Sequence, residues 1–184
     1  MRKLLAFVVA VAIALLTLTS LVFAQGAPNN AVTVNPIGLL VGVLSGEYES
    51  QTSPGSTLGI RGALWQPALG PEYDVTLLGA GIGFRKYASG RAFDGFYYGA
   101  YGSFALLSGR YYDSWDGWED VSASTLGVSG VAGFKWLSQN GFVTDLGVAV
   151  TLPILITVSA GGLTQTDVAG LLGAGLTFSV GYAW

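Results

Sequence analysis

The last nine residues of the chain, from Leu176 to Trp184, alternate between large apolar side chains and small or polar ones. Successive side chains of a β-strand point to opposite faces, so this period of two predicts a strand with one apolar face and one face of small residues. About nine to eleven residues is also the length that a tilted strand needs to cross a bilayer. An amphipathic edge strand of a soluble sandwich would show the same pattern.

Similar alternating segments recur earlier in the chain, separated by Gly, Pro, Ser, Asp and Asn. None of them shows a clean helical period of about 3.6 residues, so the pattern predicts an all-β fold with antiparallel neighbours. Strands are expected near residues 57–66, 75–87, 95–107, 123–137, 141–157 and 168–184.

The connections between these strands differ in length. Those at residues 51–56, 88–94 and 138–140 are short, whereas 66–74, 108–122 and 158–167 are mostly longer. Bacterial membrane barrels place short turns on the periplasmic side and have an even number of strands.

The even strand number requires two more strands before Gln51. They are expected at about 31–39 and 42–50, with a reversal near Leu40 to Gly42. One continuous strand over residues 34–50 is the alternative, and it would give seven strands.

A transmembrane helix is the competing interpretation of the uncharged stretch between Asp145 and Asp167. Gly147 and Pro153 interrupt a helix there, Val, Ile and Thr are frequent, and the apolar residues from Val148 onward recur at period two. These features favour a strand.

The N-terminus has the pattern of a secretory signal peptide. Arg2 and Lys3 precede an apolar run from Leu4 to Leu16, and small residues near Ala24 suit a cleavage site, so we expect residues 1–24 to be removed and residues 25–184 to form one domain. An uncleaved membrane anchor is the alternative, although the apolar run is short for a span.

Composition narrows the class of protein. Cleavage would change the net charge from −3 to −5, and the few basic residues are scattered, so nucleic acid is not expected as a partner. The chain has 28 glycines and only 10% charged residues, which is unusual for a soluble domain, and it has no cysteine for disulfides.

Five short segments have turn-and-strand patterns of one kind: Asn35 to Leu40, Gly46 to Glu49, Gly83 to Arg85, Gly133 to Trp136 and Asn140 to Gly147. They resemble a family of small bacterial outer-membrane β-barrel proteins without assigned function. The resemblance implies an eight-stranded antiparallel transmembrane β-barrel over residues 25–184, similar in architecture to the OmpA, OmpX and OmpW barrels, in the outer membrane of a Gram-negative bacterium. It implies little about activity.

The C-terminal strand also resembles the signal by which the barrel-assembly machinery recognises outer-membrane barrels. That resemblance implies two partners, the assembly machinery and outer-membrane lipid. The residues of this membrane-insertion signal are Phe178, Val180, Tyr182 and Trp184.

If the large apolar residues face lipid, the alternation places six charged residues in the lumen. Inward orientation is favoured because a basic residue on the lipid face near the midplane costs about 2–4 kcal/mol, and buried charges should then pair with one another. The pairs either form a salt-bridged plug or gate a narrow polar path. The predicted lumen charge network is Glu47, Glu49, Arg61, Arg85, Lys135 and Asp145, whereas Lys86 should face outward.

Glycines at inward positions, including Gly79, Gly83 and Gly133, leave space in the lumen. They either create a cavity above the charges or accommodate inward tyrosines such as Tyr97 and Tyr101.

The expected connection at 108–122, after the strand at 95–107, combines aromatic and acidic residues. It could bind a carbohydrate by stacking or a divalent cation through carboxylates, although it lacks the ligand spacing of a calcium loop. The alternative is an interfacial aromatic belt with an acidic tip. The candidate extracellular interaction residues are Tyr111, Tyr112, Asp113, Trp115, Asp116, Trp118, Glu119 and Asp120.

Enzymatic chemistry finds little support, because the chain has neither histidine nor cysteine. No catalytic, cofactor-binding or metal-binding residues are therefore assigned. The sequence favours a non-enzymatic barrel with a structural or surface-interaction role and a salt-bridged lumen. A narrow pore or binding barrel for a small or hydrophobic solute is the second hypothesis, and an unrecognised lipid-modifying enzyme is the third.

Overall fold

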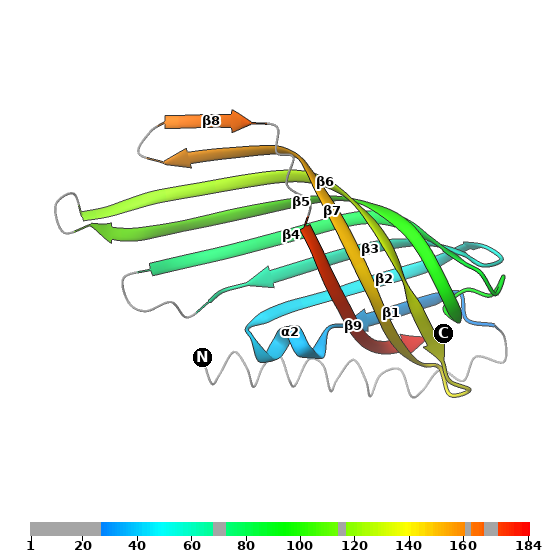
Figure 1. The fold of residues 1–184 in the computed structure, drawn as a ribbon. Coiled ribbons are helices and arrows are strands. Elements are labelled where there is room, and N and C mark those ends of the chain that lie inside the picture. The colour runs from blue at the N-terminus through cyan, green and yellow to red at the C-terminus, as the bar shows by residue number, and fades with distance from the viewer. Residues whose placement is uncertain (1–26, 68–72, 114–116, 161–162, 168–172) are drawn as a thin grey trace.

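A computed structural model describes residues 27–67, 73–113, 117–160, 163–167 and 173–184 (Figure 1). The expected signal peptide, residues 1–24, lies outside the described residues. Within those ranges, no helix has both the length and the hydropathy to cross a membrane.

Strands make up almost all of the described chain. In order, the elements are β1 (Asn30–Val34), α2 (Pro36–Leu40), β2 (Val43–Ser53), β3 (Ser56–Trp65), β4 (Tyr73–Tyr87), β5 (Gly95–Asp113), β6 (Gly117–Leu137), β7 (Phe142–Ala160), β8 (Leu163–Asp167) and β9 (Gly173–Ala183).

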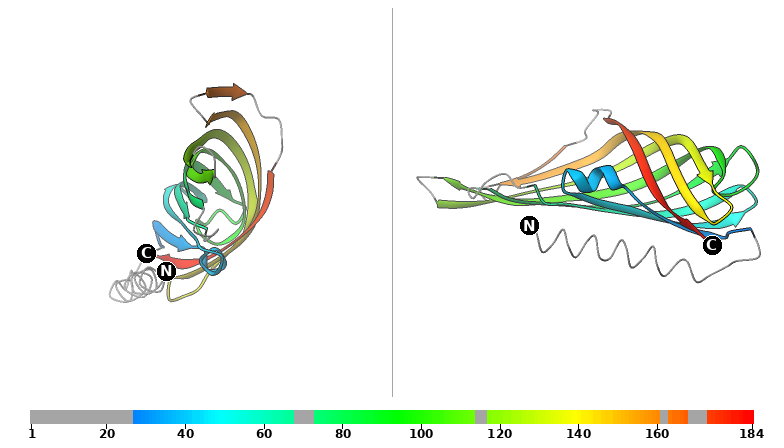
Figure 2. Two further views of the ribbon diagram at one scale, coloured as in Figure 1. Left: turned by 90° about the vertical axis from the view of Figure 1, so that its left-hand side faces the viewer. Right: turned by 90° about the horizontal axis from the view of Figure 1, so that it is seen from below.

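Eight of the nine strands close into a ring. Each strand from β1 to β7 pairs antiparallel with the next, β7 pairs with β9, and β9 pairs with β1. The short strand β8 pairs only with the far end of β7, so it extends the sheet outside the ring. Figure 2 shows the strands curving around a common axis. The predicted eight-stranded antiparallel β-barrel is confirmed, and so are the two strands before Gln51.

The first expected strand, 31–39, is too long. β1 ends at Val34, and residues 36–40 form the short helix α2 instead. Asn35 caps this helix by accepting a hydrogen bond from the Gly38 amide at 2.9 Å, and Pro36 occupies a position near the helix start that needs no amide hydrogen. The chain then reverses at Gly42, whose φ of 80° suits glycine.

The expected connection at 108–122 is also shorter than predicted. β5 and β6 remain paired from Gly95 and Lys135 out to Asp113 and Gly117, so most of the segment is a continuous hairpin. Likewise, part of the 158–167 connection belongs to β7 and β8. No proline interrupts the alternation in β5, so its hydrogen-bonded ladder continues beyond the length that crosses a bilayer.

The outer face of the ring is apolar. Side chains that point away from the lumen stay largely exposed although they are large and hydrophobic, as for Ile60 at 55% and Phe84 at 57%. A surface of this composition is adapted to lipid. The short turns at Gly55, Gly90 and Gly141 lie at the end of the barrel where Trp184 bonds to Asn30.

Candidate functional site

Four strands direct charged side chains into the lumen near the short-turn end. Because alternate residues of a strand share a face, Glu47 and Glu49 on β2 point inward while Tyr48 between them is exposed. Arg85 on β4, Lys135 on β6 and Asp145 on β7 also point inward, and all three are buried although their neighbours in the strand are exposed or partly exposed.

Arg85 links all three carboxylates. Its Nη2 lies 2.8 Å from Glu47 Oε2, and its Nη1 lies 2.6 Å from Glu49 Oε1 and 3.2 Å from Asp145 Oδ2. Arg85 as a whole is 6% exposed, so these contacts replace hydration of its guanidinium. Its Nε has no hydrogen-bond partner among the described atoms.

Lys135 is completely buried and bridges two of the same carboxylates. Its Nζ contacts Glu49 Oε1 and lies 3.3 Å from Asp145 Oδ2. Glu49 in addition accepts hydrogen bonds from the hydroxyls of Thr57 and Tyr87, both at 2.9 Å. Glu49 is therefore held by two cations and two neutral donors. We call these five charged side chains, Glu47, Glu49, Arg85, Lys135 and Asp145, the ion network.

Tyrosines complete the ion network. Tyr97 donates to Asp145 Oδ1 at 2.7 Å, and Tyr101 donates to Glu47. The Arg85 Cζ lies 4.6 Å from the centre of the Tyr97 ring and 5.5 Å from that of Tyr101, so both rings also pack on the guanidinium. Each of the three carboxylates thus accepts at least one tyrosine hydroxyl in addition to its cations.

An apolar group lies beneath the ion network at the short-turn end. Phe93, in the connection between β4 and β5, is completely buried and packs with Ala31, Val143 and Ala183. Its ring centre lies 6.0 Å from Lys135 Nζ. The lumen at this end is therefore occupied by packed side chains, first polar and then apolar.

Glycines provide the space that the tyrosines need. A Cβ atom on Gly133 or on Gly147 would lie 2.6 Å from the Tyr97 hydroxyl, and one on Gly83 would lie 2.5 Å from Cγ of Tyr101. These contacts are shorter than carbon atoms tolerate. At this level the inward glycines accommodate tyrosines, which was one of the two alternatives left open by the sequence.

Adding a methyl group at Gly133 should therefore destabilise the barrel. We expect Gly133→Ala to lower the unfolding free energy by about 1–3 kcal/mol, the usual cost of overpacking. The measurement is the urea midpoint of the folded barrel in detergent. Gly130→Ala is the matched control on the same strand, because a Cβ there meets no atom within 4 Å. Equal midpoints for the two variants would contradict the packing described here.

Arg61 lies inward but outside the ion network. It makes no ion pair within 4 Å among the described residues; its Cζ instead stacks 4.4 Å from the centre of the Tyr101 ring. Its Nη2 lies 3.4 Å from Ser129 Oγ, a long hydrogen bond. Arg61 thus spans the lumen above the ion network.

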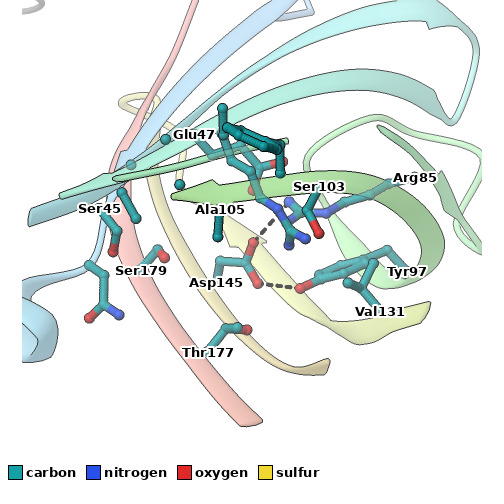
Figure 3. A pocket seen from close by; sticks show the side chains of 18 residues that line it. Ser45, Glu47, Arg85, Tyr97, Ser103, Ala105, Val131, Asp145, Thr177 and Ser179 are labelled. Atoms are coloured by element: carbon teal, nitrogen blue, oxygen red, sulfur yellow. Dashed lines mark hydrogen bonds and ion pairs between the residues drawn. The ribbon is translucent and has the colours of Figure 1, made fainter. Parts of the chain in front are cut away.

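A cavity of about 300 Å³ lies above the ion network. Figure 3 shows Glu47, Arg85, Asp145 and Tyr97 at its base, with small side chains along its sides. A Cβ on Gly79 would have no neighbour closer than 3.7 Å, so this glycine leaves open space. The second alternative, a cavity above the charges, therefore holds at this level. The small side chains around it include Ser45, Ala63, Ser103, Ala105 and Ser179.

The candidate extracellular residues are placed only in part. Tyr111, Tyr112 and Asp113 end β5, whereas Trp118, Glu119 and Asp120 begin β6. Trp115 and Asp116 lie outside the described residues. Among the described residues, no group of three or more acidic side chains is arranged to hold a metal ion.

The four residues of the insertion signal share the outward face of β9 and its end. Phe178, Val180, Tyr182 and Trp184 are all partly buried, and the Trp184 ring centre lies 6.5 Å from that of Tyr48 on β2. Lys86 is exposed on the outer face, as its position next to Arg85 predicts.

Sequence reasoning missed several partners of the charged residues. Thr57, Tyr87 and Phe93 were not singled out, although Tyr87 lies two residues from Arg85 and so shares its face. That spacing was the available signal for Tyr87. Phe93 had none, because it lies in a turn and has a φ of 64°, outside any strand alternation.

The closed ring, the apolar outer surface and the charged interior define a transmembrane β-barrel whose lumen is packed at one end and hollow above it. No protein-family model and no curated protein matches the chain. Among solved structures, it is similar to CarO of Acinetobacter baumannii, with 12% identity and a TM-score of 0.44, and to CarO2 of the same organism, with 11% and 0.43. Each similarity covers 88% of this chain and 100% of the other.

Proposed function

We propose that this protein is a non-enzymatic barrel of the bacterial outer membrane, with a structural or surface-interaction role and a lumen closed by the ion network. The observation that carries the proposal is the set of ion pairs around Arg85 and Lys135, which crosses the lumen between β2, β4, β6 and β7. Eight strands leave an interior just wide enough for side chains, so such a network blocks passage.

The membrane location is supported by the outward apolar side chains and by the closure of eight strands into a ring. In this arrangement the short turns are periplasmic and the extended hairpin of β5 and β6 is external. Residues 1–24 direct export, and Phe178, Val180, Tyr182 and Trp184 are presented to the assembly machinery before the barrel inserts into outer-membrane lipid.

The non-enzymatic role is supported by the state of the buried carboxylates. Glu49 and Asp145 accept from cations and hydroxyls at once, so neither carboxylate is placed to exchange a proton with a substrate. The cavity above them favours ligand binding as the second candidate role, since its volume lies at the lower end of known ligand pockets.

Conductance tests the closed lumen. The purified protein should give no steady channels in planar lipid bilayers, whereas a larger porin reconstituted in the same way supplies the positive control. A variant lacking residues 109–120 should also give no steady channels, because the ion network that blocks the lumen lies at the other end of the barrel. Steady unitary conductance from the full-length protein would refute the closed lumen.

Fractionation tests the location. Full-length protein expressed in a Gram-negative host should sediment with the outer membrane and migrate differently on a denaturing gel before and after boiling. Recovery with the inner membrane, together with a helical circular dichroism spectrum, would contradict the proposal.

A further inference from the structure

The ends of the strands near the long connections carry an apolar surface on the concave side of the sheet. Six neighbouring strands place one apolar residue each at the same level, each directly opposite the next in the β-sheet register. We call them the apolar wall: Val43, Trp65, Leu77, Leu107, Ala123 and Val158.

Just beyond the apolar wall, toward the strand ends, the convex face of β4 to β8 is polar, which inverts the pattern of the rest of the barrel. A row of hydroxyl side chains crosses five strands there, and Ser159 and Thr164 lie 2.9 Å apart within it. A lipid-facing segment would show the opposite order. The apolar wall is therefore adapted to contact an apolar group on the side of the barrel axis. The hydroxyl row is Thr76, Ser108, Ser122, Ser159 and Thr164.

The apolar wall is only partly covered. Trp65, Leu77 and Leu107 are half-buried, and Val158 is 43% exposed. Figures 1 and 2 show β4, β5 and β6 extending well past β1 and β9, so the wall belongs to the part of the sheet that projects beyond the ring.

The apolar wall continues into the cavity. Ala63, Gly79 and Ala105 line the cavity, and each lies two residues from a wall residue on the same strand face. The apolar wall and the cavity are therefore adjacent parts of one concave face, and we call the two together the depression. It is polar at the ion network and apolar toward the outer end.

At the polar end, Arg61 is the cavity-lining cation that has no ion pair among the described residues. Its cross-strand neighbour Glu47 is already engaged by Arg85 and Tyr101. A guanidinium presents up to five N–H donors, and here one long contact to Ser129 is made. The unused donors suit a carboxylate, the group that arginine binds best.

We propose that the depression binds a single-chain carboxylate amphiphile of the fatty-acid class. The carboxylate lies on Arg61 and the alkyl chain runs along the apolar wall toward the outer opening. The four steps along the strand from Arg61 to Trp65 span about 13 Å at a rise of about 3.3 Å per residue. On the order of ten carbon–carbon bonds of about 1.5 Å cover that distance.

Native mass spectrometry tests binding with the full-length mature barrel in octyl glucoside, a detergent with a neutral headgroup. The probes are octanoate, decanoate and dodecanoate, with dodecanol as the uncharged control. We expect one bound dodecanoate per barrel and a gain in affinity of up to about fourfold for each methylene buried. Dodecanoate should bind at least about tenfold more tightly than dodecanol, as one charge-assisted contact provides.

Two pairs of variants locate the ligand. Arg61→Gln should lower dodecanoate affinity about tenfold and remove the preference over dodecanol, whereas Lys86→Gln on the outer face should change neither. Leu77→Gln should flatten the dependence on chain length, whereas its outward neighbour Leu78→Gln should preserve it. Each variant is compared only after its gel shift on boiling shows a folded barrel.

The proposal is overturned if the wild-type barrel binds none of the carboxylates, or if it binds dodecanol as tightly as dodecanoate. Unchanged binding by folded Arg61→Gln overturns it as well. The binding measurements on the wild-type protein test the proposal even if a variant fails to fold. They do not depend on whether the barrel conducts, so this result and the bilayer result stand separately.

Discussion

Replacing Arg85 by alanine should lower the unfolding free energy of the barrel by about 3–5 kcal/mol, the range found when one partner of a buried ion pair is removed. Arg85 contacts Glu47, Glu49 and Asp145, and only Lys135 would remain to balance three carboxylates. The measurement is urea unfolding in detergent, followed by tryptophan fluorescence and by the gel shift on boiling.

The control for this variant is the next residue. Lys86→Ala removes a basic side chain from the exposed outer face and should leave the urea midpoint within about 0.5 kcal/mol of the wild type. If Arg85→Ala were no less stable than Lys86→Ala, the ion network would contribute nothing to the fold.

The second large effect is expected at Glu49. Glu49→Gln keeps the size of the side chain but removes the charge that Arg85 and Lys135 share, so a fully buried lysine is left with Asp145 as its remaining carboxylate. We expect a loss of about 3 kcal/mol or more in the same urea experiment.

Glu47→Gln is the matched comparison, because the two glutamates lie on the same face of β2 and both contact Arg85. The Glu47 side chain is 12% exposed and borders the cavity, where water can replace the lost interaction. Glu47→Gln should therefore lower the unfolding free energy by only about 1 kcal/mol. Equal losses for the two variants would show that burial does not distinguish their roles.

Most of the fold could be predicted from the sequence because the period of two is visible in nearly every strand. Exposed apolar residues such as Ile82 and Phe84 alternate with small or inward residues, and that alternation alone places Glu47, Glu49, Arg85, Lys135 and Asp145 in the lumen. An even strand number then required the hairpin before Gln51.

The errors of prediction have local causes. Helix α2 was missed because its five residues are too few to show a helical period, and only the Asn35 cap and Pro36 indicated it. The hairpin of β5 and β6 was predicted too short because polar and aromatic residues were assigned to a loop, whereas cross-strand hydrogen bonds carry the pairing to Asp113.

The contacts of the inward side chains were harder to predict than the strand faces on which these side chains lie. Alternation shows that Arg61 points into the lumen, directly opposite Glu47 on the neighbouring strand. It does not show that Glu47 forms its ion pair with Arg85, from the next strand, and not with Arg61. Long side chains reach across several strands, so their contacts depend on the curvature of the closed ring. For the same reason the roles of Tyr97 and Tyr101 followed only from the three-dimensional arrangement.

The strand pairs of the ring are of very unequal length. β5 and β6 are paired along all 19 residues of β5, whereas β1 pairs with β9 from Ala31 to Val34, with further backbone bonds from Trp184 to Asn29 and Asn30. The β1–β9 pair also joins the two most distant parts of the described chain, so its loop-closure entropy is the largest of any pair. Hairpins pair locally along the chain, so we expect the β1–β9 pair to form last, and to separate first if the barrel is forced open.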